Sequence, residues 1–244
     1  MRLPARVLVT AVVLVTQWPG LVADGYRTAS GDDGVPTRGA GTFAAAGGGT
    51  APVGSGATLV RYRAEVEEGI VWGAHQPWTP AAFAEGVDGI LAGPQGWIMS
   101  AGSPVTDAQV GLHRASWSFQ RVSGDEYDVR LRLATPDTVD GACGAAGLAT
   151  EGIYSCRAGS TIMINLRRWL RGAEGYGDDL PAYRTMLVNH EVGHFLGFDH
   201  MLCPGPGEAA PVMQTQTISL AGCRPNPYPF TTYGTFVTGP WTPS

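Results

Sequence analysis

One eleven-residue stretch constrains this chain more than any other feature. It reads H-E-x-x-H-x-x-G-x-x-H and runs from His190 to His200. On a helix, His190 and His194 are about one turn apart, so both imidazoles project from the same face. Gly197 lets the chain leave the helix through a left-handed conformation, which can bring His200 round as a third ligand. Glu191 lies about 100° around the helix from His190, where it can reach a metal-bound water without being a ligand. The stretch therefore predicts one zinc ion, three ligands and a general base.

Two other interpretations compete with a catalytic zinc. A helix can carry His and Glu as a solvated polar face, although the added Gly and third His argue against it. A structural zinc is the second interpretation, but structural sites are usually closed by four protein ligands, whereas three leave a position for water. The nearest fourth ligand is Cys203, three residues after His200. Using it would leave Cys223 without a partner, so we assign Cys203 to a disulfide.

The N-terminus has the layout of a secretory signal peptide. Arg2 and Arg6 precede an apolar run over residues 7–15, and small residues suited to cleavage stand before Asp24. We therefore predict that residues 1–23 direct export to an extracytoplasmic location. A retained membrane anchor is the competing interpretation, but an uninterrupted apolar span of about 20 residues is missing.

Four cysteines in an exported protein are typical of two disulfides. Three pairings exist, and the sequential one, Cys143–Cys156 with Cys203–Cys223, closes the shortest loops. We expect the sequential pairing for that reason. Each of its loops would constrain the unfolded chain by about 3 kcal/mol on the chain-entropy model.

Composition divides the remaining chain and excludes two classes of partner. Residues 24–56 are rich in Gly, Ala, Ser, Thr and Pro, which predicts a flexible linker. Residues 57–244 are long enough for one globular domain, which we expect to be a monomer. The net charge is −5 and the chain has no run of basic residues, so nothing favours nucleic-acid binding. No second apolar segment of spanning length follows the N-terminal one, so we expect no other membrane contact.

The order of the expected elements predicts an α/β or α+β domain with a mixed sheet, and of the two we expect α+β, with a twisted sheet, a backing helix and an active-site helix. Thr79 and Pro80 open the backing helix over residues 81–91, and Asp178 or Asp179 caps the helix that carries the histidines. The chain after Cys223 is predicted to be irregular. The expected strands are residues 58–70, 97–100, 115–122, 128–134 and 161–166.

With these residues in place, the chain resembles the metzincins, a clan of zinc-dependent endopeptidases. The resemblance implies that His190, His194 and His200 hold zinc and that Glu191 is the general base. It also implies a tight turn with a Met beneath the metal, and Met213 stands at the expected place, thirteen residues past His200.

From about residue 57 to residue 229, the chain also resembles an uncharacterised family of exported actinobacterial proteins carried as metzincin-like. That family implies the fold and the location but not the substrate. Met201 follows the third His, and Thr215 stands where some metzincins carry a Tyr, so the chain matches no named metzincin family. The resembling segments are Arg61-Tyr62-Arg63 with Glu65, Gly96-Trp97, Ser155-Cys156-Arg157, Asn165-Leu166-Arg167-Arg168-Trp169, Ala210-Pro211-Val212-Met213 and Cys223-Arg224-Pro225-Asn226.

The leading hypothesis is a secreted zinc endopeptidase that acts on proteins or peptides. An extended substrate is expected to add to an exposed edge strand, for which residues 128–134 are the candidate. A zinc-stabilised binding module without turnover and a narrow amidase acting on cell-wall peptides are the alternatives. The other histidines, His75 and His113, are assigned to the surface, and Trp97, Trp117 and Trp169 are assigned to the core.

Overall fold

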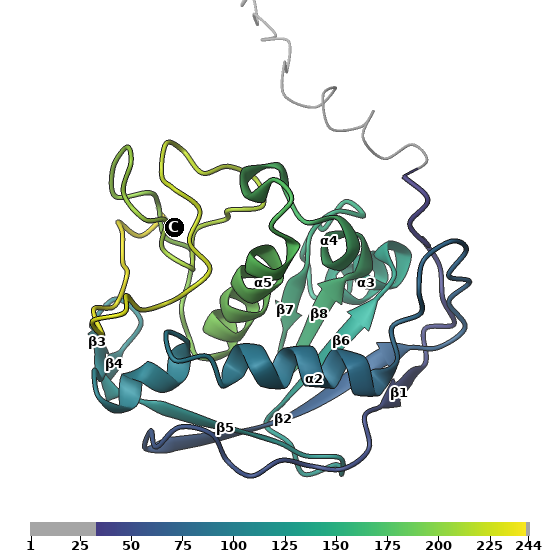
Figure 1. Ribbon diagram of the computed structural model, residues 1–244, viewed down its shortest axis with the longest axis horizontal. Helices are drawn as coiled ribbons and strands as arrows, with labels where there is room; N and C mark the ends of the chain where they lie inside the picture. The colour runs from purple at the N-terminus through teal and green to yellow at the C-terminus, as the bar shows by residue number, and fades with distance from the viewer. Residues whose placement is uncertain (1–32, 243–244) are drawn as a thin grey trace, which may run out of the picture. The chain divides into compact units, whose positions relative to one another are not determined.

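A mixed six-stranded sheet forms the centre of the fold (Figure 1). The computed structural model describes residues 33–242, so the predicted export segment, residues 1–23, lies outside the described residues. The long strand β2 pairs in parallel with β5 and β6, β6 pairs in parallel with β8, and β1 and β7 lie antiparallel at the two ends. The strands are β1 (Phe43–Ala45), β2 (Thr58–Glu67), β5 (Trp117–Arg121), β6 (Val129–Ala134), β7 (Cys156–Ala158) and β8 (Thr161–Asn165), and a separate hairpin comprises β3 (Val105–Asp107) and β4 (Leu112–Ala115).

Helices cover both faces of this sheet, and strand alternation decides which residues meet them. In β8, Ile162 and Ile164 join the main core beneath α2 and α5, whereas Met163 joins a smaller cluster beneath α3. The fold class predicted from periodicity, α+β with a mixed sheet, is therefore confirmed. The helices are α2 (Pro80–Leu91), η2 (Trp97–Ala101), α3 (Pro136–Gly144), α4 (Leu166–Arg171), η3 (Glu174–Tyr176) and α5 (Leu180–Phe195).

Local sequence signals locate the helix starts well. The Thr79 side chain accepts a hydrogen bond from the Ala82 N–H, and Pro80 occupies the first turn of α2. The Asp179 side chain caps α5 in the same way, by accepting from the Ala182 N–H. These caps satisfy backbone donors that a helix leaves free at its N-terminus.

The predicted linker is wrong for the described residues from 34 to 56. Phe43–Ala45 forms β1 at the edge of the sheet, and Val53 forms an isolated bridge to Phe119. The Gly41 N–H also donates to the buried carboxylate of Glu67 at 2.9 Å. This segment is held by backbone pairing to β2, which low side-chain hydrophobicity does not reveal.

One strand assignment and one assignment of an edge strand also need correction. Residues 97–100 belong to the 3₁₀ helix η2, where Trp97 is fully buried. A short apolar run cannot distinguish a strand from a buried helical turn. Residues 128–134 do form a strand, but β6 lies between β2 and β8 and has no free edge. The edge strand on that side of the sheet is β7.

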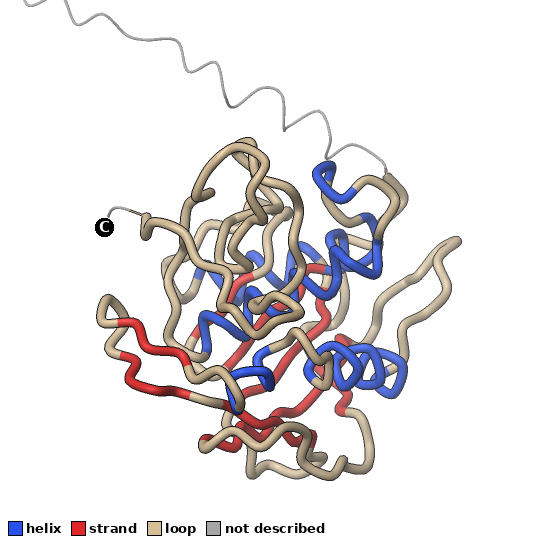
Figure 2. The backbone as a smooth tube through the Cα atoms, turned by 60° about the vertical axis from the view of Figure 1, so that its left-hand side comes forward, coloured by secondary structure: helices blue, strands red, loops and turns tan. Residues whose placement is uncertain are grey.

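The two disulfides have the expected connectivity. Cys143–Cys156 links α3 to β7. Cys203–Cys223 joins two positions in the chain after α5, one on each side of Met213. After α5 the described chain forms loops without a further helix or strand (Figure 2). Within residues 33–242, no helix is both long enough and apolar enough to cross a membrane.

Candidate metal centre

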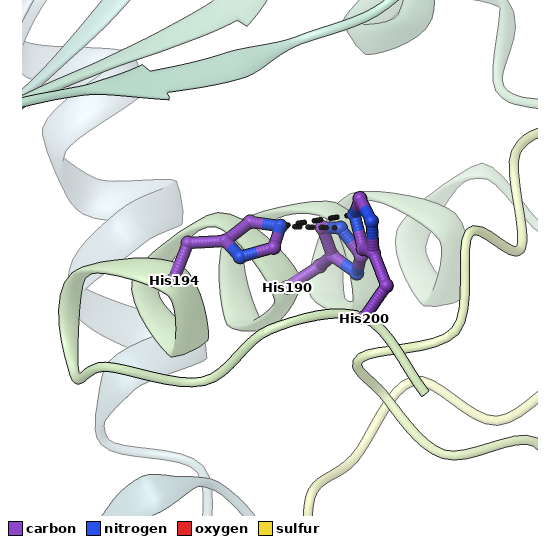
Figure 3. Close-up of side chains that lie close together, drawn as sticks. All are labelled: His190, His194 and His200. Carbon is purple, nitrogen blue, oxygen red and sulfur yellow. Dashed lines mark hydrogen bonds between the residues drawn. The ribbon is translucent and has the colours of Figure 1, made fainter. Parts of the chain in front are cut away.

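The three predicted ligands converge at the end of α5 (Figure 3). His190 and His194 project from the helix, and His200 comes from the loop that follows it. The Nε2 atom of His194 lies 3.2 Å from Nε2 of His190 and 3.1 Å from Nε2 of His200. Tetrahedral zinc with bonds of 2.0–2.1 Å would space its ligand nitrogens by about 3.3 Å. Both distances from His194 therefore match the spacing that a zinc ion needs, and all three ligand atoms lie within 4.8 Å of one another.

Hydrogen bonds to backbone carbonyls fix which nitrogen of each helix histidine is free. His190 Nδ1 lies 2.8 Å from the Val212 carbonyl, and His194 Nδ1 lies 2.8 Å from the Phe198 carbonyl. A carbonyl oxygen only accepts hydrogen bonds, so each Nδ1 carries the hydrogen and each Nε2 presents a lone pair. Facing lone pairs at this distance repel unless a cation lies between them. This donor set fits a divalent metal.

Burial keeps the ligands neutral, the form that binds metal. Burial lowers the pKa of His190 well below its ordinary value and lowers that of His194 to about 4. Burial also lowers the pKa of His200. All three imidazoles are consequently unprotonated at neutral pH.

The fourth predicted site residue, Glu191, is a buried acid. Its side chain is buried, and its Oε2 atom has no hydrogen-bond partner among residues 33–242. Burial raises its pKa to about 8. Glu191 lines the same cavity as the three histidines, and a cation there would favour its ionised form. A buried carboxyl group with an unpaired oxygen is costly, which makes Glu191 a candidate for a chemical role.

The turn after α5 depends on Gly197, whose φ of 105° is strained for any residue with a Cβ. The Phe198 N–H then donates to the Gly193 carbonyl at 3.0 Å. This reversal places the Phe198 carbonyl against His194 and sends the chain back toward His200. The structure thus gives Gly197 the conformation for which the sequence analysis selects glycine.

Met213 packs against the inner side of α5. Its side chain is buried, and a Cβ built at Gly193 would overlap its sulfur and lie 3.0 Å from the Trp97 ring. The preceding carbonyl, of Val212, is the one that orients His190. Met213 also accepts the Met201 N–H through its own carbonyl, at 3.1 Å. The Met213 segment thus supports both a helix ligand and the loop that carries the third ligand.

The three histidines line a cavity of about 600 Å³. The edge strand β7 contributes Cys156 and Arg157 to its wall, and the loop after Met213 contributes residues 215–218. Arg157 is exposed and is the only arginine among the lining residues. Sequence reasoning missed this wall because β7 is only three residues long and is defined by its pairing with β8.

A buried polar network supports the loop opposite β7. The Gln216 amide accepts from Tyr176 Oη at 2.8 Å and from the Asn226 N–H at 3.0 Å. Asn226 in turn donates to the Ala210 and Tyr228 carbonyls. No sequence signal points to this role, since Gln216 stands between the polar residues Thr215 and Thr217. Of the other histidines and tryptophans, His113 is exposed, His75 is half-buried, and Trp97, Trp117 and Trp169 are buried in the core.

A family model described as "Protein of unknown function (DUF3152)" matches residues 29–225, which include the three histidines and Met213. The chain belongs to this DUF3152 family. Comparison with curated proteins and with solved structures gives no match.

Metal binding gives the first test of the site. We expect one zinc ion per chain by elemental analysis, and we expect His194→Gln to abolish tight binding in isothermal titration because it removes the central ligand. His113→Gln, at an exposed histidine outside the cluster, is the matched control and should bind as the unmodified chain does. Equal zinc affinity in the two variants would contradict the assignment.

Two helix glycines give a paired test of the Met213 contact. Gly89→Ala in α2 meets nothing within 4 Å and should stabilise the protein by about 0.5–1 kcal/mol, since Ala is the better helix former. Gly193→Ala should instead destabilise it by about 1–3 kcal/mol through overpacking against Met213 and Trp97. Denaturant unfolding measures both changes. An increase in stability for Gly193→Ala would contradict the prediction, because it would show that Met213 and Trp97 leave space for a Cβ.

Proposed function

We propose that this chain is a secreted zinc-dependent endopeptidase. The observation that carries the proposal is that three converging imidazole nitrogens share one open cavity with the buried Glu191, whose Oε2 atom has no hydrogen-bond partner among residues 33–242. Three ligands leave a fourth position free, which is the pattern of catalytic rather than structural zinc. Cys203, the nearest fourth ligand, is bonded to Cys223 and is not available to close the site.

Zinc at these ligands would supply Lewis acidity, which lowers the pKa of water and polarises a carbonyl. Glu191 is placed to take the proton of the attacking water and to return it to the leaving amine. Val212 and Phe198 hold the two helix imidazoles in the tautomer that donates electrons from Nε2.

The cavity is suited to an extended peptide. One side of β7 pairs with β8, and Cys156 and Arg157 of β7 border the cavity beside the histidines. A peptide backbone can add to such an edge through main-chain hydrogen bonds. In this proposal β7 replaces β6 as the substrate-binding strand. The two disulfides support an extracytoplasmic location, where such bonds persist.

Glu191→Gln tests the reaction directly. The variant should retain zinc but cut a mixed peptide library about 10²- to 10⁴-fold more slowly, because it cannot accept the proton. A chelated sample of the unmodified chain should also be inactive, and mass spectrometry of the products gives the cut sites. Full activity in the Gln variant would contradict the mechanism. A folded, zinc-loaded chain that cuts neither these peptides nor cell-wall peptides would favour a binding module.

Arg157 predicts a preference within the substrate. This exposed arginine borders the cavity that the three histidines line. We expect peptides with an acidic side chain near the scissile bond to be cut faster, and Arg157→Glu to reduce that preference about tenfold, as for loss of one charge-assisted hydrogen bond. Arg114→Glu, an equal charge change at an exposed residue outside the cavity, is the control. An unaltered preference in Arg157→Glu would contradict this role.

A further inference from the structure

The last described residues lie directly against the segment that carries His200. The N–H and the hydroxyl of Thr242 both donate to the His200 carbonyl, at 3.0 and 3.1 Å. The Leu202 N–H donates to the Pro240 carbonyl at 2.6 Å, and Met201 forms an antiparallel bridge with Trp241. We propose that residues 238–242, which we name the C-terminal strap, position His200 as the third metal ligand. This inference rests on the proposed metal centre but not on peptidase activity.

His200 needs such support more than the other two ligands do. His190 and His194 are fixed by α5 and by carbonyls that bind their Nδ1 atoms. His200 lies in a loop, and no helix hydrogen bonds set its backbone. The Met201 N–H is bound on one side by the Met213 carbonyl. The strap supplies the contacts on the other side, so the ligand-bearing segment is held between the Met213 turn and the strap.

The packing of the strap is close enough to be specific. A Cβ built at Gly239 would overlap the Leu202 carbonyl and lie 3.0 Å from Pro211. The Thr238 hydroxyl lies 3.6 Å from the sulfur of Met201, which is itself buried. Glycine at position 239 is therefore what permits the backbone of the strap to approach the His200 loop.

The consequence for metal binding follows from pre-organisation. A ligand already held in place loses little conformational entropy when the metal binds, whereas a ligand on a loose loop loses more. Removing the strap contacts should weaken metal binding while leaving the two helix ligands intact. Substitutions in the outer shell of metal sites commonly cost 10- to 100-fold in affinity.

Three changes to the full chain test the strap. Thr242→Val removes the hydroxyl bond but keeps the backbone bond, Gly239→Val forces the strap away from Leu202, and a chain ended at Thr238 removes the contacts of Pro240, Trp241 and Thr242. The control is Thr231→Val, which removes a similar bond, from the Thr235 N–H to the Thr231 hydroxyl at 3.1 Å, away from His200.

Three quantities are measured for each variant. They are the zinc affinity by chelator competition, the absorption spectrum of the cobalt-substituted protein and the melting temperature of the metal-free protein. We expect a loss of zinc affinity of about 10- to 100-fold for Gly239→Val and for the shortened chain. Thr242→Val should show a smaller loss in the same direction and an altered cobalt spectrum, whereas Thr231→Val should stay within twofold of the unmodified chain. The metal-free melting temperatures of the two Thr variants should be similar.

The outcomes separate the strap from the proposed function. If Thr242→Val and Gly239→Val bind zinc as tightly as the unmodified chain and give its cobalt spectrum, the positioning role is wrong. If Thr242→Val lowers only the melting temperature of the metal-free protein, the strap is a packing element and the inference is again overturned. Failure of the unmodified chain to bind zinc overturns the metal centre and the strap together. Zinc binding without peptidase activity overturns only the proposed function.

Discussion

Two hydrogen bonds from imidazole Nδ1 atoms to backbone carbonyls are the interactions on which the candidate site depends. They turn the Nε2 lone pairs of His190 and His194 toward a common point, where they face His200. Both carbonyls belong to residues that follow the ligand helix: Phe198 lies just after the Gly197 turn, and Val212 precedes Met213. The polar chemistry of the site is thus set by how the chain after α5 folds back on the helix.

That return path explains several features that look unrelated in the sequence. Gly197 reverses the chain, Gly193 makes room for Met213, and the Cys203–Cys223 disulfide closes the loop that contains Met213. The described chain beyond α5 has no helix or strand. Side-chain hydrogen bonds, a disulfide and tight packing stabilise it instead. An ordered but irregular segment of this kind is typical of a site whose geometry is stabilised by specific contacts.

Local spacing made much of this predictable. The histidine cluster, a helix cap at Asp178 or Asp179, the disulfide pairing and a mixed sheet follow from residues that are close in sequence or from periodicity. The strand assigned to residues 97–100 is a local error, whereas the other errors concern long-range pairing. Residues 34–56 are ordered by pairing with β2, and the short strand β7 is defined by its pairing with β8. The chain after Cys223 is irregular as expected, but its contacts with the His200 loop had no sequence signal. Segments of low hydrophobicity or short length are hard to predict, because their stability comes from backbone pairing with residues that are far away in the sequence.

The most direct test of the metal centre is zinc K-edge X-ray absorption on the chain purified without added metal. We expect a first shell of three imidazole nitrogens and one oxygen at 2.0–2.1 Å, with no sulfur. That result would support a site with one position open beside Glu191. A shell that contains sulfur, or one filled by four protein ligands, would contradict a catalytic centre and indicate a structural zinc. A folded chain without metal, and without affinity for it, would contradict the metal centre itself.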